Sequence, residues 1–390
     1  MKEYLTAESV RAGHPDKLCD YISDKIVDAC LYKDKSARVA VETMAARHRI
    51  VVAGEITCAA RINIRDIVWE ALSERGYNPM KYLVYVYVHR QSPDIADGVD
   101  HSVESRSGDT SWYATLGAGD QGTVVGYACD ENRDRIPTPL LYAHAICRRL
   151  DDVWKDGVIK GLGPDGKAQV TIEYEDGSPI GVKSIVVSVQ HRKDKDPEQL
   201  RGEIISNVLW PVFEKLPFDD NTEILINPSG RFVEGGPDAD TGLTGRKLMV
   251  DTYGGLAGHG GGAFSGKDPT KIDRSGAYMA RYIAVNLVSA GFARRCQVSL
   301  SYAIGKADPT AVRVETFGTG IFPDEEIGNI VREKFNLRPG AIIEKLKLKD
   351  TFFAKYACYG HFGQGFARWD SDDRWGDLSE FRRNYAKDHK

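Results

Sequence analysis

The sequence predicts an α+β fold in which three similar domains, related by a pseudo-threefold arrangement, pack helices on mainly antiparallel sheets. Two observations lead to this prediction. The chain has 390 residues, of which 42% are hydrophobic, so it is long enough for two or three domains with cores of their own. The order helix, strand, strand, helix also recurs at intervals of about 120 to 135 residues, which is the size of a domain.

The three copies follow one another along the chain. Their expected elements are a helix from Pro15, strands over 38–43 and 49–57 and a helix over about 63–75; a helix near Pro139, strands over 169–174 and 184–190 and a helix near Asp196; and a helix from Pro269, strands over 297–304 and 311–317 and a helix near Pro323. The helices repeat apolar residues about every four positions, and the strands alternate apolar with polar ones. Because this order of elements is common, and the copies match in pattern rather than in residues, the triplication is a hypothesis.

We place the domains at residues 1–112, 113–231 and 232–390. The first domain ends in a polar stretch, Ser92–Leu116, which is rich in Asp, Ser and Gly and has no periodicity. A loop of this length is usually a lid or a disordered segment, so we assign a lid loop to about 91–116. The charged residues from Arg368 onward are expected to form a surface tail.

Composition excludes several classes of function. The net charge of -4 provides no basic field for nucleic acid, and the absence of a long apolar run predicts no membrane span. The polar N-terminus is unlike a signal peptide. Seven cysteines without a CxxC pair indicate reduced thiols, rather than a disulfide framework or a zinc site. We therefore expect a cytoplasmic protein.

The first chemical motif is Gly13–Lys17 (GHPDK). Proline is favoured at the first helical position, so Pro15 is expected to begin a helix with His14 as its N-cap. A helix N-terminus attracts anions, and His14 and Lys17 add donors there. Asp16 fits a magnesium ion that bridges to phosphates. Taken alone, however, an ordinary polar helix start explains the motif at least as well.

The second motif is Gly260–Arg274, a glycine-rich loop that carries Lys267, Lys271 and Asp273 and runs into the helix expected to begin at Pro269, with Asp268 as its cap. The spacing nearly matches the phosphate-binding pattern GxxxxGK[ST], but Asp268 replaces the Ser or Thr that would contact magnesium. The pattern therefore lacks its metal ligand, and Asp273 offers a carboxylate instead. A plain glycine linker would not carry this set of charges.

Two further glycine motifs are less specific. Gly242–Lys247 (GLTGRK) brings Arg246 and Lys247 to a tight turn that could bind a polyphosphate or could be a charged hairpin. Gly117–Gly122 (GAGDQG) presents Asp120 and precedes a strand, which argues against a dinucleotide-binding fold. Spacing alone places Glu42 and Glu55 on a solvated strand face.

The combination of cations, carboxylates and glycine loops is more specific than its parts, and it predicts a metal–polyphosphate substrate. No GxSxG or HExxH motif occurs. We therefore expect chemistry without a covalent enzyme intermediate.

Together these motifs resemble the S-adenosylmethionine synthetases. The matching strings follow the family order along nearly the whole chain and are GHPDK at 13–17, QSPD at 91–94, GAGDQG at 117–122, GRFV at 230–233, GLTGRK at 242–247, DTYGG at 251–255, HGGGAFSGKDPTKIDRS at 259–275 and YGHFG at 359–363. The Ser92–Leu116 segment is longer than expected for the gating loop of this family, and the stretch before it is shorter.

The resemblance implies the three-domain fold of this family and an enzyme in which methionine sulfur attacks the 5′ carbon of ATP. The released triphosphate is then hydrolysed to phosphate and diphosphate. The resemblance also implies a homodimer with active sites at the interface, usually paired into a homotetramer. With it, Glu42 and Glu55 become site residues, contrary to the inference from spacing.

Residue by residue, the resemblance implies a catalytic set in which His14 hydrogen-bonds the leaving 5′ oxygen. The residues expected to act in catalysis are His14, Asp120, Lys167, Arg246, Lys247 and Lys267. The residues expected to bind ATP are His14, Asp165, Lys167, Arg231, Phe232, Asp240, Arg246, Lys247, Ala263 and Lys267. Methionine would be bound by Glu55, Gln91, Asp240 and Lys271.

The same resemblance implies two Mg2+ ions per site, held by Asp16 and Asp273, and one K+ per subunit, held with Glu42. Two rival functions remain at this stage. A P-loop-like NTPase or kinase would use 261–267, although Asp268 argues against it. An inactive regulatory subunit would be expected to have lost the cationic and metal-binding residues, all of which are present.

Overall fold

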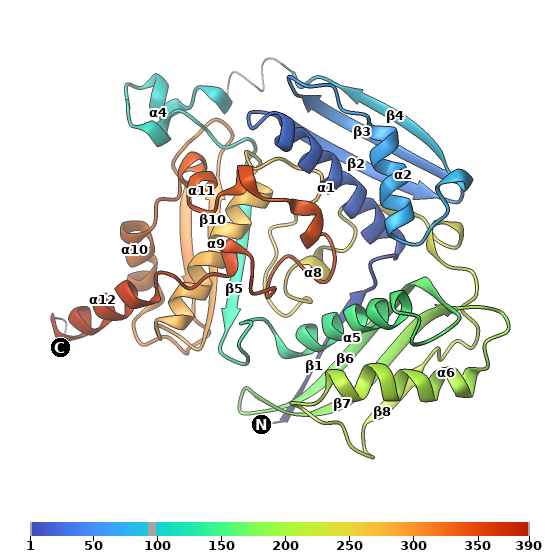
Figure 1. Ribbon diagram of the computed structural model, residues 1–390. Coiled ribbons are helices and arrows are strands. Elements are labelled where there is room, and N and C mark those ends of the chain that lie inside the picture. The colour runs from blue at the N-terminus through green and yellow to red at the C-terminus, as the bar shows by residue number, and fades with distance from the viewer. Residues whose placement is uncertain (1, 93–98, 389–390) are drawn as a thin grey trace.

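The computed structural model describes residues 2–92 and 99–388, and it contains three sheets with helices packed on one face of each (Figure 1). Most neighbouring strands run antiparallel, which confirms the predicted α+β class. No helix in the described part of the chain is long and apolar enough to cross a membrane. All seven cysteines are free thiols, as expected.

The first sheet has the strand order β4-β3-β2-β9 and is covered on one face by α1 and α2 (Figure 1). Its elements are α1 (Pro15–Lys33), β2 (Arg38–Ala46), β3 (Arg49–Thr57), α2 (Ile64–Glu74), β4 (Leu83–His89) and β9 (Gly242–Leu243). The apolar stripe of α1, with Leu18, Ile22 and Ile26 fully buried, packs toward this sheet. Strands β3 and β4 are a parallel pair in an otherwise antiparallel sheet.

The second sheet has the order β1-β6-β7-β8 and is covered by α5 and α6. Its elements are β1 (Lys2–Val10), α5 (Thr138–Lys155), β6 (Leu162–Glu175), β7 (Ser178–His191), α6 (Pro197–Ile204), α7 (Trp210–Val212) and β8 (Glu223–Ile226), with a π-helical turn at Ile205–Leu209. Its core is a separate cluster of buried apolar side chains.

The third sheet has the order β11-β10-β5, with α9 packed along it (Figure 1). The elements of this part of the chain are β5 (Gly122–Cys129), α8 (Leu248–Asp251), α9 (Ile272–Ser289), β10 (Arg295–Tyr302), β11 (Ala311–Glu315), α10 (Asp324–Lys334), α11 (Pro339–Lys345) and α12 (Trp375–Asp388). The predicted order of helix, strand, strand and helix is thus confirmed in all three copies.

Each sheet takes one strand from a distant part of the chain. Strand β1 joins the central sheet, where Val10 pairs with Lys167 on β6. Strand β5 pairs with β10, and the short β9 pairs with β2. The domain boundaries at residues 112 and 231 remain predictions. Strands β1, β5 and β9 each pair with a strand that these boundaries assign to another domain.

Two local predictions were wrong. The third-copy helix begins at Ile272 and not at Pro269, because Asp268 binds β2: its carboxylate accepts the Val39 N–H at 2.7 Å, and its own N–H donates to the Val39 carbonyl at 3.0 Å. The residues from Arg368 onward do not form a surface tail. Trp369 is fully buried and stacks on Tyr278 at 3.8 Å between ring centroids.

The predicted lid loop at 91–116 falls partly on residues 93–98, which lie outside the described residues. The rest includes α4 (Val103–Arg106), whose Glu104 carboxylate accepts the backbone N–H groups of Ala307 and Asp308 at 2.8 and 3.2 Å. Arg338 bonds Asp109 at 3.0 Å in the same region. The described part therefore lies on the C-terminal part of the chain, and a lid function stays a prediction.

Candidate active site

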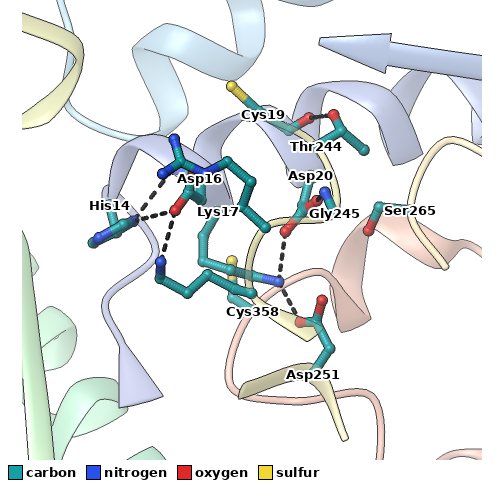
Figure 2. A network of polar contacts seen from close by, with 12 residues as sticks. His14, Asp16, Lys17, Cys19, Asp20, Thr244, Gly245, Asp251, Ser265 and Cys358 are labelled. Atoms are coloured by element: carbon teal, nitrogen blue, oxygen red, sulfur yellow. Dashed lines mark hydrogen bonds and ion pairs between the residues drawn. The ribbon is translucent and has the colours of Figure 1, made fainter. Parts of the chain in front are cut away.

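The start of α1 carries the first group of predicted site residues (Figure 2). His14 is the N-cap, as predicted, and its Nδ1 accepts the N–H of Asp16 at 3.2 Å. Asp16 is 2% exposed and accepts Lys247 Nζ at 2.7 Å and the Leu243 N–H at 3.0 Å. Arg246 approaches the same carboxylate at 3.8 Å. The GHPDK and GLTGRK motifs are therefore one cluster.

His14 is neutral in this cluster. Burial, with the charges of Lys247 and Lys167 adding to it, lowers the pKa of His14 to about 4. Since Nδ1 accepts a hydrogen bond, the neutral ring carries its proton on Nε2. His14 therefore presents an N–H donor that stays uncharged at neutral pH.

Strand β6 delivers Asp165 and Lys167 to the same end of α1. The charges of Lys167 and Asp240 both affect the pKa of His14, so both side chains lie within electrostatic range of its ring. The Asp165 carboxylate accepts the N–H groups of Gly166 and Gly236, each at 2.7 Å. Burial raises the pKa of Asp165, although these bonds oppose the shift. Asp165 thus ties β6 to the loop that leads to Asp240.

The start of α9 carries the second group. Lys267 Nζ bonds the Asp273 carboxylate at 2.5 Å, and Lys271 Nζ bonds Asp268 at 3.0 Å. Lys271 occupies the N-cap position, but its side chain makes no capping bond. Gly119 packs against Thr270 and Lys271, so the loop bearing Asp120 lies beside this helix start. Asp120 itself accepts the N–H of Gln121 at 2.7 Å.

The open face of the first sheet carries Glu42 and Glu55. Ala40 on β2 pairs with Glu55 on one side and bridges to Lys267 on the other. Glu55 therefore lies near the second group, about 10 Å from Lys267 at two strand spacings. Glu42 is two residues from Ala40 and exposed on the same face.

At the edge of this sheet, Glu55 approaches His89 at 3.5 Å, and the Gln91 N–H donates to Thr57 Oγ1 at 3.3 Å. Gln91 thus follows β4 at the end of the strands where Glu55 lies.

The starts of α1 and α9 lie apart within one chain, but the glycine loops beside them are in contact. Strand β2 pairs with Gly242 at Ala45 and bridges to Lys267 at Ala40, and five residues of strand span about 17 Å. Between them, a Cβ on Gly245 would lie 2.7 Å from that of Ala263, so the two glycine loops touch there. Gly245 has φ +80°, which favours glycine.

Two of the residues predicted to contact adenosine, Arg231 and Phe232, lie beside the central sheet, whereas Ala263 lies in the second glycine loop. The Phe232 carbonyl accepts the His191 N–H at 2.9 Å, and Arg231 is exposed next to it. A cavity of about 710 Å³ adjoins them and is lined in part by Gln190, His191 and Val233. The Gln190 side chain also accepts the Asp165 N–H at 3.2 Å, which links this cavity to the first group.

One expectation about the first motif was wrong. Lys17 does not point toward an anion at the helix start. It is fully buried and pairs with Asp20 at 2.9 Å and with Asp251. Burial opposes the shift, but the two carboxylates raise the pKa of Lys17 above its ordinary value.

Sequence reasoning also missed Asp20 and Asp24, which bind the backbone of the two glycine loops. Their spacing of four residues from Asp16 was the available signal.

The P-loop alternative does not fit this geometry. A P-loop connects a strand directly to a helix that begins at its GK[ST] end. Here the element before the glycine loop is α8, and α9 begins five residues after Lys267. The loop 261–267 instead bridges to β2 through Lys267.

Comparison with known protein families covers nearly the entire chain. Three family models match in order: the S-adenosylmethionine synthetase N-terminal domain over residues 2–93, the central domain over 115–232 and the C-terminal domain over 234–371. The chain belongs to the S-adenosylmethionine synthetase family. This confirms both the resemblance and the three-domain fold.

Relatives called S-adenosylmethionine synthase are similar over almost their whole length. A protein of Desulforudis audaxviator is 50% identical over 371 residues, which are 93% of this chain and 94% of the relative. A Thermus thermophilus protein is 50% identical over 382 residues, 95% and 96% of the two chains. A Finegoldia magna protein is 49% identical over 368 residues, 93% and 94%.

Proposed function

We propose that this protein, as a methionine adenosyltransferase, makes S-adenosylmethionine from ATP and L-methionine. The sulfur lone pair forms a bond to the 5′ carbon of ATP while the bond from that carbon to oxygen breaks. The electron pair leaves with triphosphate, and the product is a sulfonium. Hydrolysis of the triphosphate to phosphate and diphosphate follows in the same site. Family membership and the chemistry of both helix starts support this proposal.

The observation that carries the proposal is the position of His14, which caps α1 beside the Asp16 carboxylate and its partner Lys247. Its neutral ring, with the proton on Nε2, offers a hydrogen bond to the 5′ oxygen as negative charge develops there. No proton has to leave the sulfur, so the reaction requires alignment and charge stabilisation rather than a general base.

Cations at the two helix starts bind the triphosphate in this proposal. Lys167, Arg246 and Lys247 surround Asp16 and His14 at the start of α1, and Lys267 lies at the start of α9. Both helix N-termini favour anions. Asp165 holds β6 in place near Lys167, and Asp120 belongs to the same site.

Asp16 and Asp273 would each hold one of two Mg2+ ions. The described residues contain no cluster of three or more potential metal ligands, but Mg2+ is usually held by one or two carboxylates together with substrate phosphates and waters. Each aspartate meets this requirement, because each lies in the first turn of a helix beside phosphate-binding cations. Bound there, Mg2+ would neutralise phosphate charge. Glu42 would contribute to one K+ per subunit.

Methionine carries an ammonium and a carboxylate, so its site requires both charges. Glu55 and Asp240 would bind the ammonium end, Lys271 the carboxylate, and Gln91 would complete the site. Adenosine would contact Arg231 and Phe232, which lie beside the cavity next to β7, and Ala263 of the second glycine loop.

We further propose a homodimer with shared active sites, usually paired into a tetramer. The open face of the first sheet exposes Met44, Tyr85 and Tyr87 around Glu42 and Glu55. Exposed apolar residues in such number favour burial against another protein surface. A second copy on this face could bring the Lys267 group of one chain to the His14 group of the other.

The test of function is mass spectrometry of products from ATP, methionine, Mg2+ and K+. S-adenosylmethionine with equal amounts of phosphate and diphosphate is expected. Formation of ADP without methionine would contradict the proposal and support an NTPase.

The shared site is tested by mixing two inactive variants, His14→Asn and Lys267→Met, after reversible dissociation. If one site uses both chains, mixed dimers regain an intact site and activity returns. No recovery in verified mixed dimers would place each site within one chain.

A further inference from the structure

Four aspartates recur at every fourth position of α1: Asp16, Asp20, Asp24 and Asp28. Residues four apart lie on one helix face, so these carboxylates form a single line, here called the aspartate row. Carboxylates at this spacing repel, and Asp20 and Asp24 are fully buried. Each buried carboxylate therefore needs its own donors.

Every member of the row accepts backbone N–H groups from a segment distant in sequence. The donors are Leu243 to Asp16 at 3.0 Å, Gly245 to Asp20 at 2.8 Å, Gly266 to Asp24 at 2.9 Å, and Phe353 and Ala354 to Asp28 at 2.6 and 2.9 Å. Figure 2 shows Asp16 and Asp20 along α1, with Gly245 beside Asp20. One helix face thus holds three separate loops.

Asp20 holds the loop that carries two triphosphate-binding cations. Its Oδ1 accepts the Gly245 N–H, and its Oδ2 accepts Lys17 Nζ at 2.9 Å. Gly245 directly precedes Arg246 and Lys247. A shift of this peptide would move both cations relative to His14.

Asp24 binds the glycine loop that carries Lys267, at residues next to Lys267 and next to its partner Asp273. Besides the Gly266 N–H, it accepts Arg274 Nη2 at 2.6 Å and Ser265 Oγ at 3.2 Å. Gly266 directly precedes Lys267, and Arg274 directly follows Asp273. Asp24 therefore bonds a neighbour of each member of the Lys267–Asp273 pair.

We propose that Asp20 and Asp24 are positioning residues for adenosyl transfer. Asp20 sets the Arg246–Lys247 group beside the His14 of its own chain. Asp24 sets the Lys267–Asp273 group, which in the shared site acts with the His14 of the second copy. This rests on the proposed function for the roles of those groups. Helix α1 then fixes the position of both phosphate-binding loops. Its first turn carries His14 and Asp16, its second turn binds one loop through Asp20, and its third turn binds the other through Asp24.

The carboxylate chemistry explains why an amide cannot substitute. Asp24 accepts three donors, whereas the amide of Asn has one acceptor oxygen and an NH2 group that would face a donor. Asp24→Asn should therefore release at least one loop contact. Asp24→Glu keeps the charge for Arg274 but moves it by one methylene, so it tests position separately from charge.

The matched control is Asp28→Asn, in the same helix. Asp28 binds two backbone N–H groups of a loop without proposed site residues. Both carboxylate oxygens of Asp28 accept an N–H, so Asp28→Asn should also release one loop contact, but from a loop that carries no proposed site residue.

The experiment compares Asp20→Asn, Asp24→Asn, Asp24→Glu and Asp28→Asn by kcat, both KM values, melting temperature and calorimetric binding of a non-hydrolysable imido analogue of triphosphate with Mg2+. Loss of register should lower kcat about 10- to 100-fold in the first three variants and weaken triphosphate binding, with little change in KM for methionine. Asp28→Asn should retain wild-type kcat and binding.

Equal losses in Asp28→Asn at equal melting temperature would overturn the proposal, because general destabilisation would then explain them. Wild-type kcat in folded Asp24→Glu would also overturn it, even if Asp24→Asn fails to fold. Triphosphate binding needs no turnover, so an inactive wild-type protein would contradict the proposed function while the binding comparison still decides the roles of Asp20 and Asp24.

Discussion

The starts of α1 and α9 carry the same pair of charged groups, an aspartate and a lysine, on different local structures. In both helices the second residue is an aspartate, Asp16 or Asp273, that bonds a lysine of a glycine loop, Lys247 or Lys267, at 2.7 and 2.5 Å. At α1, however, His14 caps the helix with its side chain. At α9 no side chain caps the first turn, and the Arg274 N–H donates instead to the Lys271 carbonyl at 3.1 Å.

The difference teaches that a proline after a potential N-cap residue predicts a helix start only when the side chain of that residue does not bond another element. Pro15 begins α1 because His14 turns back onto the Asp16 N–H. Asp268 instead bonds β2 and Lys271, so the chain after Pro269 makes a further turn before α9 begins. Three predictions test this comparison, in order of decreasing effect.

The largest effect is expected from removing the ring at the α1 start. His14→Asn should lower adenosyl transfer by about 10²- to 10³-fold, the cost of losing one donor to a developing oxyanion. Hydrolysis of added triphosphate should fall much less, because no 5′ oxygen leaves in that step. Rates of S-adenosylmethionine and phosphate formation measure the two steps.

Lys267→Met at the α9 start provides the contrast, since it should lower both activities by weakening triphosphate binding. Equal losses of both activities in His14→Asn would count against a role on the leaving group.

A smaller effect is expected for the metal requirement. Asp273→Asn should raise the Mg2+ concentration needed for half-maximal rate about tenfold, which corresponds to about 1.4 kcal/mol of binding free energy. The measurement is the initial rate against Mg2+ at saturating substrates. An unchanged Mg2+ titration would remove Asp273 as a ligand, and the two helix starts would then differ in metal chemistry.

The smallest effect is expected on folding. Asp268→Ala should lower the free energy of unfolding by about 1–3 kcal/mol, because the buried Val39 N–H loses its acceptor. Asp268→Asn keeps one acceptor oxygen and should cost less. Denaturant unfolding measures both variants. Wild-type stability in Asp268→Ala would show that the side-chain bond to β2 contributes little to the stability of the fold.

Much of the fold was predictable because periodicity reports local structure. The helix from Pro15 and the strands at 49–57 and 311–317 were expected close to their observed positions, since apolar spacing distinguishes a helix from a strand. The burial of Trp369 was not predictable. It depends on stacking against Tyr278, and on an ion pair between Arg281 and Asp370 at 2.8 Å that makes a charged segment compatible with burial.

The candidate site was predictable as a set of residue types but not as a set of neighbours. Motifs named His14, Asp16, Lys247 and Lys267, yet Lys17 was expected to face an anion and is buried instead. A lysine beside a helix start has the same sequence signature in either role. Only the partners Asp20 and Asp251 decide between them, and Asp251 is far away in the chain.

The sequence by itself determined the family, the order of elements and the chemical groups at the two helix starts, because these follow from local spacing and motifs. The tertiary structure decided which strands share a sheet, where α9 begins, and which loops the aspartate row holds. These features depend on contacts between distant residues, such as Val10 with Lys167 and Asp24 with Gly266. Such contacts contribute to stability only in the folded chain, so the local sequence pattern does not report them.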